Sequence, residues 1–95
     1  MNLSSELLIE IGILVQQVRT ETMDQQELAL RTGLSRSTIS AIERGKAVNA
    51  KALFDVMAFL GLLEEIMQVV ANKNRLFTQN RARKARNPKE LPNDF

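Results

Sequence analysis

Residues 25–45 read QQELALRTGLSRSTISAIERG, and this stretch decides the fold of the chain. Apolar residues recur at helical spacing before and after Gly33, which predicts two short helices joined by a turn. The positions expected to be buried are Leu28, Ala29, Leu34, Ile39 and Ile42. Asp24 and Ser35 have side chains that cap the first turn of a helix. Gly33 and Gly45 lie where the two helices should end, because glycine readily takes the left-handed conformation of a helix C-terminus. The stretch therefore predicts a helix-turn-helix.

In a helix-turn-helix, the second helix enters the major groove of DNA while the first helix braces it. The brace requires a small residue where the helices cross, and Ala29 lies four residues before the turn glycine. Ile39 provides an apolar anchor on the inner face of the second helix. Its outer face is short and polar, with Arg36, Ser37 and Ser40. An arginine on the leading turn can pair with O6 and N7 of guanine, so the pattern favours DNA recognition.

The segment QQELALRTGLSRSTISAIERGK resembles the central signature of the Cro/C1-type helix-turn-helix family, also called the XRE family. The resemblance covers about residues 7–67. It implies an all-α fold, a compact five-helix Cro/C1 repressor-like DNA-binding domain. It also implies a transcriptional regulator that binds a palindromic operator as a homodimer. The basic C-terminal tail lies outside the resemblance.

The resemblance also implies roles for matching residues. Base contacts are implied at the start of the second motif helix and one turn later, at Arg36, Ser37, Thr38, Ser40 and Ala41. Phosphate contacts are implied at the start of the brace helix and in the loop after the second motif helix, at Gln25, Arg44 and Lys46. Arg19 matches a position that often forms an internal salt bridge. We favour that role over DNA contact, with Glu43 as its partner.

Three further helices are predicted outside the motif. The first begins at a cap on Ser4 or Ser5 and ends near Thr20. Its main apolar stripe comprises Leu7, Ile11, Leu14, Val15 and Val18. Asn49 caps the fourth, Gly61 ends it, and its predicted core face comprises Leu53, Phe54, Val56, Met57 and Leu60. The fifth contains Leu62, Leu63, Ile66, Met67, Val69 and Val70. No segment alternates with the period of a strand, so we expect no sheet.

The charge of the chain is uneven. Residues 1–71 contain six basic residues (Lys or Arg) and nine acidic ones (Asp or Glu). Residues 72–95 contain seven basic residues and two acidic ones. We predict a helix-turn-helix DNA-binding domain over residues 1–71 and a basic, partly disordered tail over residues 72–95, poorly ordered after about Thr78. The tail has three candidate uses: an arm on DNA phosphates, a solubilising segment, or a docking surface for a protein. The arm would comprise Arg81, Arg83, Lys84 and Arg86.

Surplus apolar surface predicts a homodimer. We expect Leu63, Met67 and Val70 at its interface, while Ile66 fills the core of the monomer. The N-terminal turn from Leu3 to Ile9 is a competing interface.

The composition excludes several functions. The chain has no Cys and no His, so it lacks a thiol nucleophile, a disulfide, the commonest metal ligand and the commonest general base. We predict no enzyme activity, cofactor or metal. No stretch is long enough to cross a membrane and the N-terminus is no secretory signal, so we expect a cytoplasmic protein.

The function predicted from these observations is sequence-specific binding of double-stranded DNA by a homodimeric repressor that also controls its own promoter. One alternative is an antitoxin that represses its operon and binds a toxin protein. Another is an RNA-binding or adaptor protein that uses the arginine-rich tail.

Overall fold

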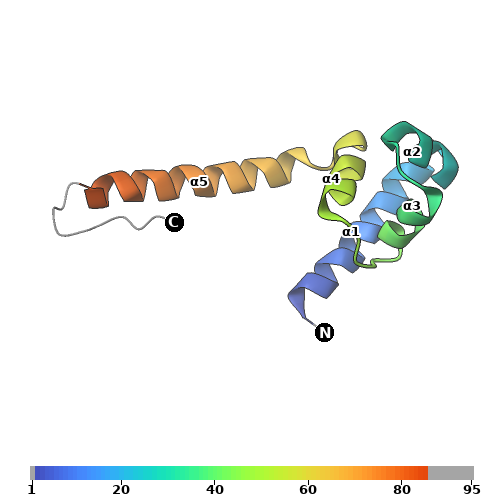
Figure 1. Cartoon of the computed structure of the whole chain (residues 1–95), viewed down its shortest axis with the longest axis horizontal. Helices are drawn as coiled ribbons and strands as arrows, with labels where there is room; N and C mark the ends of the chain where they lie inside the picture. Colours follow the sequence, from blue (N-terminus) through green and yellow to red (C-terminus); the bar gives the residue numbers. More distant parts are fainter. Residues whose placement is uncertain (1, 86–95) are drawn as a thin grey trace. The chain divides into compact units, whose positions relative to one another are not determined.

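Five helices make up most of the part of the chain that the structure, a computed structural model, describes: residues 2–85, with side chains through Arg83. They are α1 (Leu3–Thr20), α2 (Gln25–Thr32), α3 (Arg36–Glu43), α4 (Ala50–Phe59) and α5 (Glu64–Ala85) (Figure 1). No strand occurs within residues 2–85, which confirms the predicted all-α fold. The chain divides into two units, Met1–Leu63 and Glu64–Phe95.

The ends of α2 and α3 form as their capping residues predict. The side chain of Asp24 accepts a hydrogen bond from the Glu27 N–H (2.9 Å), and Ser35 Oγ accepts one from the Thr38 N–H (3.1 Å). Gly33 ends α2 with a φ of 72°, a conformation that costs a residue with a side chain about 1–2 kcal/mol. These local contacts place the turn of the motif where the sequence predicts it.

The start of α1 differs from the prediction. Its cap is Asn2, whose Oδ1 accepts a hydrogen bond from the Ser5 N–H (2.8 Å). Ser4 and Ser5 lie inside the first turn, so the prediction that either one caps the helix is wrong. Asn, Asp and Ser cap helices about equally well, so local chemistry did not separate these candidates. The predicted end at Thr20 is confirmed.

The core of the first unit lies where α3 packs against α1 and α2. It is a cluster of buried residues from four helices: Val15, Leu28, Ala29, Ile39, Ile42 and Val56. Gly12 permits close approach of α1 to α3, because a Cβ on it would lie 2.5 Å from the Ile42 carbonyl oxygen. Each large side chain buried here contributes about 1.5–3 kcal/mol relative to exposure. The burial predicted for the motif residues Leu28, Ala29, Ile39 and Ile42 is confirmed.

Other predicted core positions are less buried than expected. Leu7 and Leu14 of α1 and Phe54 of α4 are exposed, and Leu34 is half-buried. Leu34 is only partly buried but packs against the core cluster as predicted, whereas the prediction that Phe54 lies on the core face is wrong. The reason is geometric, because α1 and α4 each turn only one narrow strip of their surface toward the core. In α1 the buried strip contains Gly12, Val15 and Arg19.

The second unit contains α5, which begins at Glu64, after a turn at Gly61. Leu62 belongs to that turn and not to the helix, because its N–H donates to the Met57 carbonyl (2.7 Å). The helix runs for 22 residues to Ala85, seven residues beyond Thr78. That the segment after about Thr78 is poorly ordered without a partner stays a prediction. Neither Gly nor Pro occurs between residues 64 and 85, so nothing there interrupts a helix.

The side chains of α5 are exposed along its described length. Ile66 is 40% exposed, and its predicted place in the monomer core is therefore wrong. Within residues 2–85, no helix is both long enough and apolar enough to cross a membrane.

Candidate nucleic-acid interface

Helix α3 has an apolar inner face and a polar outer face. Ile39 and Ile42 are at most 2% exposed and anchor α3 to the core. Arg36 and Ser37, on its leading turn, are exposed, while the other residues predicted to contact bases, Thr38, Ser40 and Ala41, are half-buried. The small side chains on this face allow an approaching base pair to come close to the helix backbone.

Gln25, the first residue of α2, connects the brace helix to α3. Its Nε2 donates to Glu43 Oε1 (2.9 Å), and its Oε1 accepts from Arg36 Nε (3.4 Å). Because a carboxylate can only accept and a guanidinium can only donate, these two neighbours determine the orientation of the amide. Gln25 therefore holds Arg36, the predicted base reader, at the front of α3.

Glu43 belongs at the same time to a buried ion pair with Arg19 of α1. Arg19 Nη2 donates to Glu43 Oε1 (3.0 Å), its Nε donates to Glu43 Oε2, and its Nη1 donates to the Met23 carbonyl (3.0 Å). Arg19 is 7% exposed and Glu43 is 9% exposed. The hydrogen bond to Glu43 raises the pKa of Arg19, although burial alone would lower it. Arg19 is therefore positively charged at any pH below the ordinary pKa of an arginine. The predicted internal salt bridge is confirmed.

The four side chains form a continuous network from the core to the surface, in the order Arg19, Glu43, Gln25 and Arg36. It joins three helices, α1, α2 and α3. Within the described part of the chain, the two Nη groups of Arg36 make no hydrogen bond, which leaves the outer edge of its guanidinium for an acceptor pair such as O6 and N7 of guanine.

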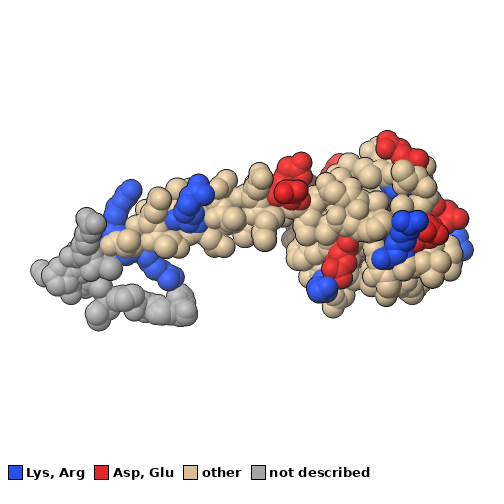
Figure 2. Space-filling view, turned by 90° about the horizontal axis from the view of Figure 1, so that it is seen from above, with Lys and Arg blue, Asp and Glu red and all other residues tan. Residues whose placement is uncertain are grey.

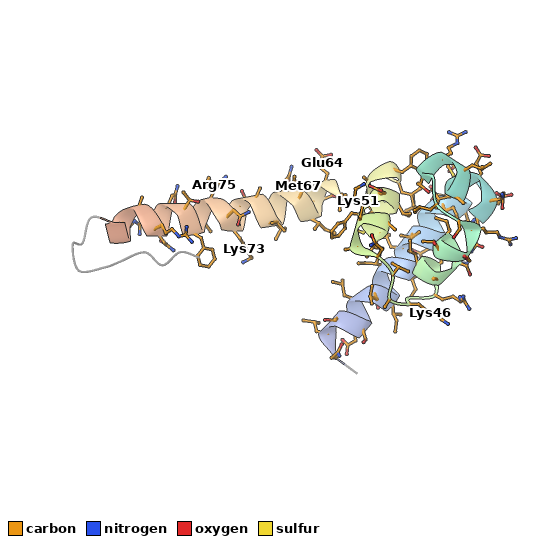
Figure 3. All side chains as sticks on the ribbon, viewed as in Figure 1. Lys46, Lys51, Glu64, Met67, Lys73 and Arg75 are labelled. Atoms are coloured by element: carbon orange, nitrogen blue, oxygen red, sulfur yellow. The ribbon has the colours of Figure 1, made fainter. Side chains whose placement is uncertain are left out.

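The cations predicted to contact phosphates lie just after α3. Arg44, the C-cap residue, is exposed, and its Nε donates to the Ser40 carbonyl (3.4 Å). Lys46 lies in the following loop with its side chain directed outward (Figure 3). The backbone N–H of Lys46 donates to the Ala41 carbonyl (3.0 Å), which holds the loop against the end of the helix.

A shallow groove runs between the outer side of α3 and the start of α4. It is lined by residues that include Ser37, Thr38 and Ala41 from α3 and Asn49 and Lys51 from the α4 side. Lys51, which Figure 3 labels, pairs with Asp55 (2.8 Å). Neither Asn49, which the sequence predicts only as a helix cap, nor Lys51 is among the predicted DNA contacts. The signal that could have identified Lys51 is its place in the first turn of α4, the helix that follows the motif loop.

The remaining predicted site residues that the structure describes lie on α5 or, in the case of Leu63, directly before it in the chain. Leu63 is half-buried, and Met67 and Val70 are exposed. Arg81 and Arg83 lie in the last turns of the helix, whereas the side chain of Lys84 and all of Arg86 lie outside the described residues. The interface and the arm that these residues would form stay predictions.

Two short helices joined by a glycine turn, with a polar leading turn on the second, define a DNA-binding helix-turn-helix. A family model described as helix-turn-helix matches residues 16–65, more than half of the chain. The chain belongs to this family, the Cro/C1-type or XRE helix-turn-helix proteins. It is therefore a DNA-binding transcriptional regulator. Comparisons with curated proteins and with solved structures gave no match.

Proposed function

We propose that the protein binds a palindromic operator in double-stranded DNA as a homodimer and represses transcription, including that of its own gene. The observation that carries the DNA-reading part is the network that holds Arg36 at the front of α3. A side chain held in position loses less conformational entropy when it binds a base than a mobile one does. Self-repression is supported by the family resemblance and the small size of the chain.

In this proposal, the outer face of α3 reads bases through Arg36, Ser37, Thr38, Ser40 and Ala41. Gln25 lies at the N-terminus of α2, where backbone N–H groups and the helix dipole favour a phosphate. Arg44 and Lys46 contact phosphates on the other side of α3, and we add Lys51 to this group because it borders the groove beside Ser37. Phosphate contacts set the register of the protein on DNA, and base contacts give the specificity.

Selection of bound sequences from a random pool of duplex DNA tests the proposal. We expect an inverted repeat whose half-sites are about 10 base pairs apart, centre to centre, because two recognition helices must enter successive turns of one groove. An enriched site without two-fold symmetry would contradict the homodimer. Failure to enrich any duplex would contradict sequence-specific recognition.

A second candidate function is an antitoxin that represses its own operon while it binds a toxin protein. It is favoured by exposed apolar side chains on two helices, Leu3, Leu7 and Leu14 of α1 and Met67 and Val70 of α5, which a partner could cover. Purification from the native cell decides between the candidates. A stoichiometric second protein indicates the antitoxin, and a homodimer without one indicates the repressor.

A DNA arm formed by Arg81, Arg83, Lys84 and Arg86 would add phosphate contacts to either function. Deletion of residues 79–95 separates this contribution from reading by α3, and also tests the RNA-binding alternative. Loss of specific duplex binding on this deletion, together with a harmless Arg36→Ala, would contradict reading by α3. Because a transcriptional regulator acts where the DNA is, we retain the cytoplasmic location as part of the proposal.

A further inference from the structure

We propose that α5 pairs with α5 of a second copy in antiparallel orientation, with Ile66 of each copy against Phe77 of the other. This inference rests on the homodimer of the proposed function and specifies which surface forms it. It does not depend on the DNA site or on repression.

The apolar surface of α5 has the spacing of a two-helix seam. Ile66, Val70, Lys73 and Phe77 follow one another at alternating steps of four and three residues, the a and d positions of a heptad pattern, and Leu63, just before the helix, continues the spacing. Ile66 is 40% exposed, Val70 51% and Phe77 70%. Most of the stability of a helix in a protein comes from packing of its apolar face and not from helix propensity. The seam therefore needs a partner.

The charges on α5 indicate the orientation of that partner. Glu64 and Glu65 lie in its first turn, and Arg81 and Arg83 lie in its last turns. Figure 2 shows acidic side chains where the helix begins and basic ones along its later half. A parallel pair would place like charges opposite each other at both ends. An antiparallel pair places the acidic end of each copy beside the basic end of the other.

Lys73 determines the register as well as the orientation. In a parallel pair, the two copies of Lys73 would face each other within the apolar seam, which is unfavourable for like charges. In the antiparallel register that pairs Ile66 with Phe77, the next layer pairs Val70 with Lys73. The aliphatic stem of Lys73 can then pack against Val70 of the second copy while its ammonium group reaches water. Outside these layers, Val69 of one copy and Leu76 of the other lie close enough to extend the apolar contact.

The antiparallel pair also separates the two DNA-binding units. Each unit joins α5 at Glu64, and in this register the two Glu64 positions are 15 residues apart along the pair, about 22 Å at 1.5 Å per residue. A parallel pair would join both units at the same end. Recognition of half-sites about 34 Å apart favours attachment at opposite ends.

Disulfide trapping tests the orientation directly, because the natural chain has no cysteine. We would mix the full-length variants Ile66→Cys and Phe77→Cys, one of them carrying a mass tag, allow the subunits to exchange under reducing conditions, and then oxidise. We expect the mixed disulfide as the main product. Each variant alone should stay uncrosslinked, because its two cysteines would lie 11 residues apart, about 16 Å, beyond the roughly 7 Å that a disulfide spans.

A disulfide between two copies of Ile66→Cys would show a parallel pair and overturn the proposal. Absence of any crosslink would also overturn it, since the two helices would then not be adjacent. All of these measurements are made without DNA. A DNA-binding failure with the mixed disulfide present would therefore count against the proposed function alone.

Two matched sets of variants test which face of α5 pairs and whether its end charges contribute. Self-association of each variant is measured by sedimentation. Val70→Asp should abolish self-association, whereas Ala71→Asp, which adds the same charge about 100° around the helix, should leave it intact. Reversing both glutamates, with Glu64→Lys and Glu65→Lys, should raise the dimer dissociation constant by a smaller factor, about twofold at low salt, because these side chains lie outside the seam and act on the basic end of the second copy only through screened, longer-range attraction. In a parallel dimer this reversal would leave the constant unchanged, because like charges would still face each other.

Discussion

The two units of the chain use the same types of apolar residue in opposite ways. In the first unit, Val15 and Ile39 are fully buried by neighbouring helices. In the second unit, Ile66 and Val70 follow an equally regular helical spacing and stay exposed. The difference lies in the neighbours and not in the residues. A helical apolar pattern therefore predicts that a helix has a face to bury, while the partner that buries the face must be found in three dimensions.

The largest expected effect on stability comes from comparing the same type of substitution, isoleucine to alanine, in the two units. Ile39→Ala should lower the free energy of unfolding by about 2–5 kcal/mol, because it leaves a cavity in a packed core. Ile66→Ala should leave the unfolding of the monomer almost unchanged and weaken only association. Urea denaturation at several protein concentrations separates the two: the loss in Ile39→Ala should not depend on concentration, whereas that in Ile66→Ala should. Equal, concentration-independent losses would show that Ile66 is packed within the monomer.

Glu43→Ala should lower the free energy of unfolding by about 3 kcal/mol, since it leaves the buried Arg19 without its carboxylate. It should also remove the acceptor that orients the Gln25 amide, so DNA affinity should fall in a variant that is still folded at low temperature. The matched control is Glu65→Ala in α5, an exposed glutamate that should leave the unfolding of the first unit unchanged. Thermal unfolding followed by circular dichroism, with binding measured well below the transition, checks both effects.

Arg36→Ala should weaken binding to the selected operator by about 1–3 kcal/mol and relax the preference at one base position, with the fold unaffected. Arg83→Ala, which removes an arginine from α5, should leave that base preference intact. The base preferences of the two variants are compared by measuring their affinities, by fluorescence anisotropy, for operator duplexes altered one base pair at a time. If Arg83→Ala relaxed the preference and Arg36→Ala did not, the reading surface would lie on α5.

The smallest expected effect is that of Lys46→Ala. We expect it to weaken binding to all duplexes by a similar factor and to lower the slope of log affinity against log salt by about 0.9, the value for one phosphate contact. Lys51→Ala, which removes a lysine already paired with Asp55, should change the slope less. An unchanged slope in Lys46→Ala would place this side chain away from the DNA backbone.

Much of the motif could be predicted from the sequence because its signals are local. Asp24, Ser35 and Asn49 each accept a hydrogen bond from a backbone N–H three residues later, and Gly33 supplies the conformation that ends α2. These interactions depend on neighbours in the chain, so the residue type and its position suffice. The same reasoning was wrong at the start of α1, where Asn2 competed with two serines of equal capping ability.

Predictions of burial were correct for the motif and less so outside it. Leu28 and Ile39 are buried because the crossing of two adjacent helices determines their surroundings. Whether Phe54 or Ile66 is covered depends on how a distant helix packs, which apolar spacing does not specify. Helix α5 extends past Thr78 to Ala85 although this segment is basic, because no Gly or Pro interrupts it.

By itself, the sequence determined that the chain is all-helical, where α2 and α3 begin and end, and that α3 presents Arg36 and two serines on its leading turns. Only the tertiary structure decided how Arg36 is held. Gln25 and Glu43 are 18 residues apart, and Gln25 and Arg36 are 11 apart, so no local spacing brings them together. Packing of α3 against both α1 and α2 does so, because burial of Ile39 and Ile42 sets the position of the whole helix. A hydrogen-bond network joins groups that the core has already placed within hydrogen-bonding distance, here 2.9 Å and 3.4 Å.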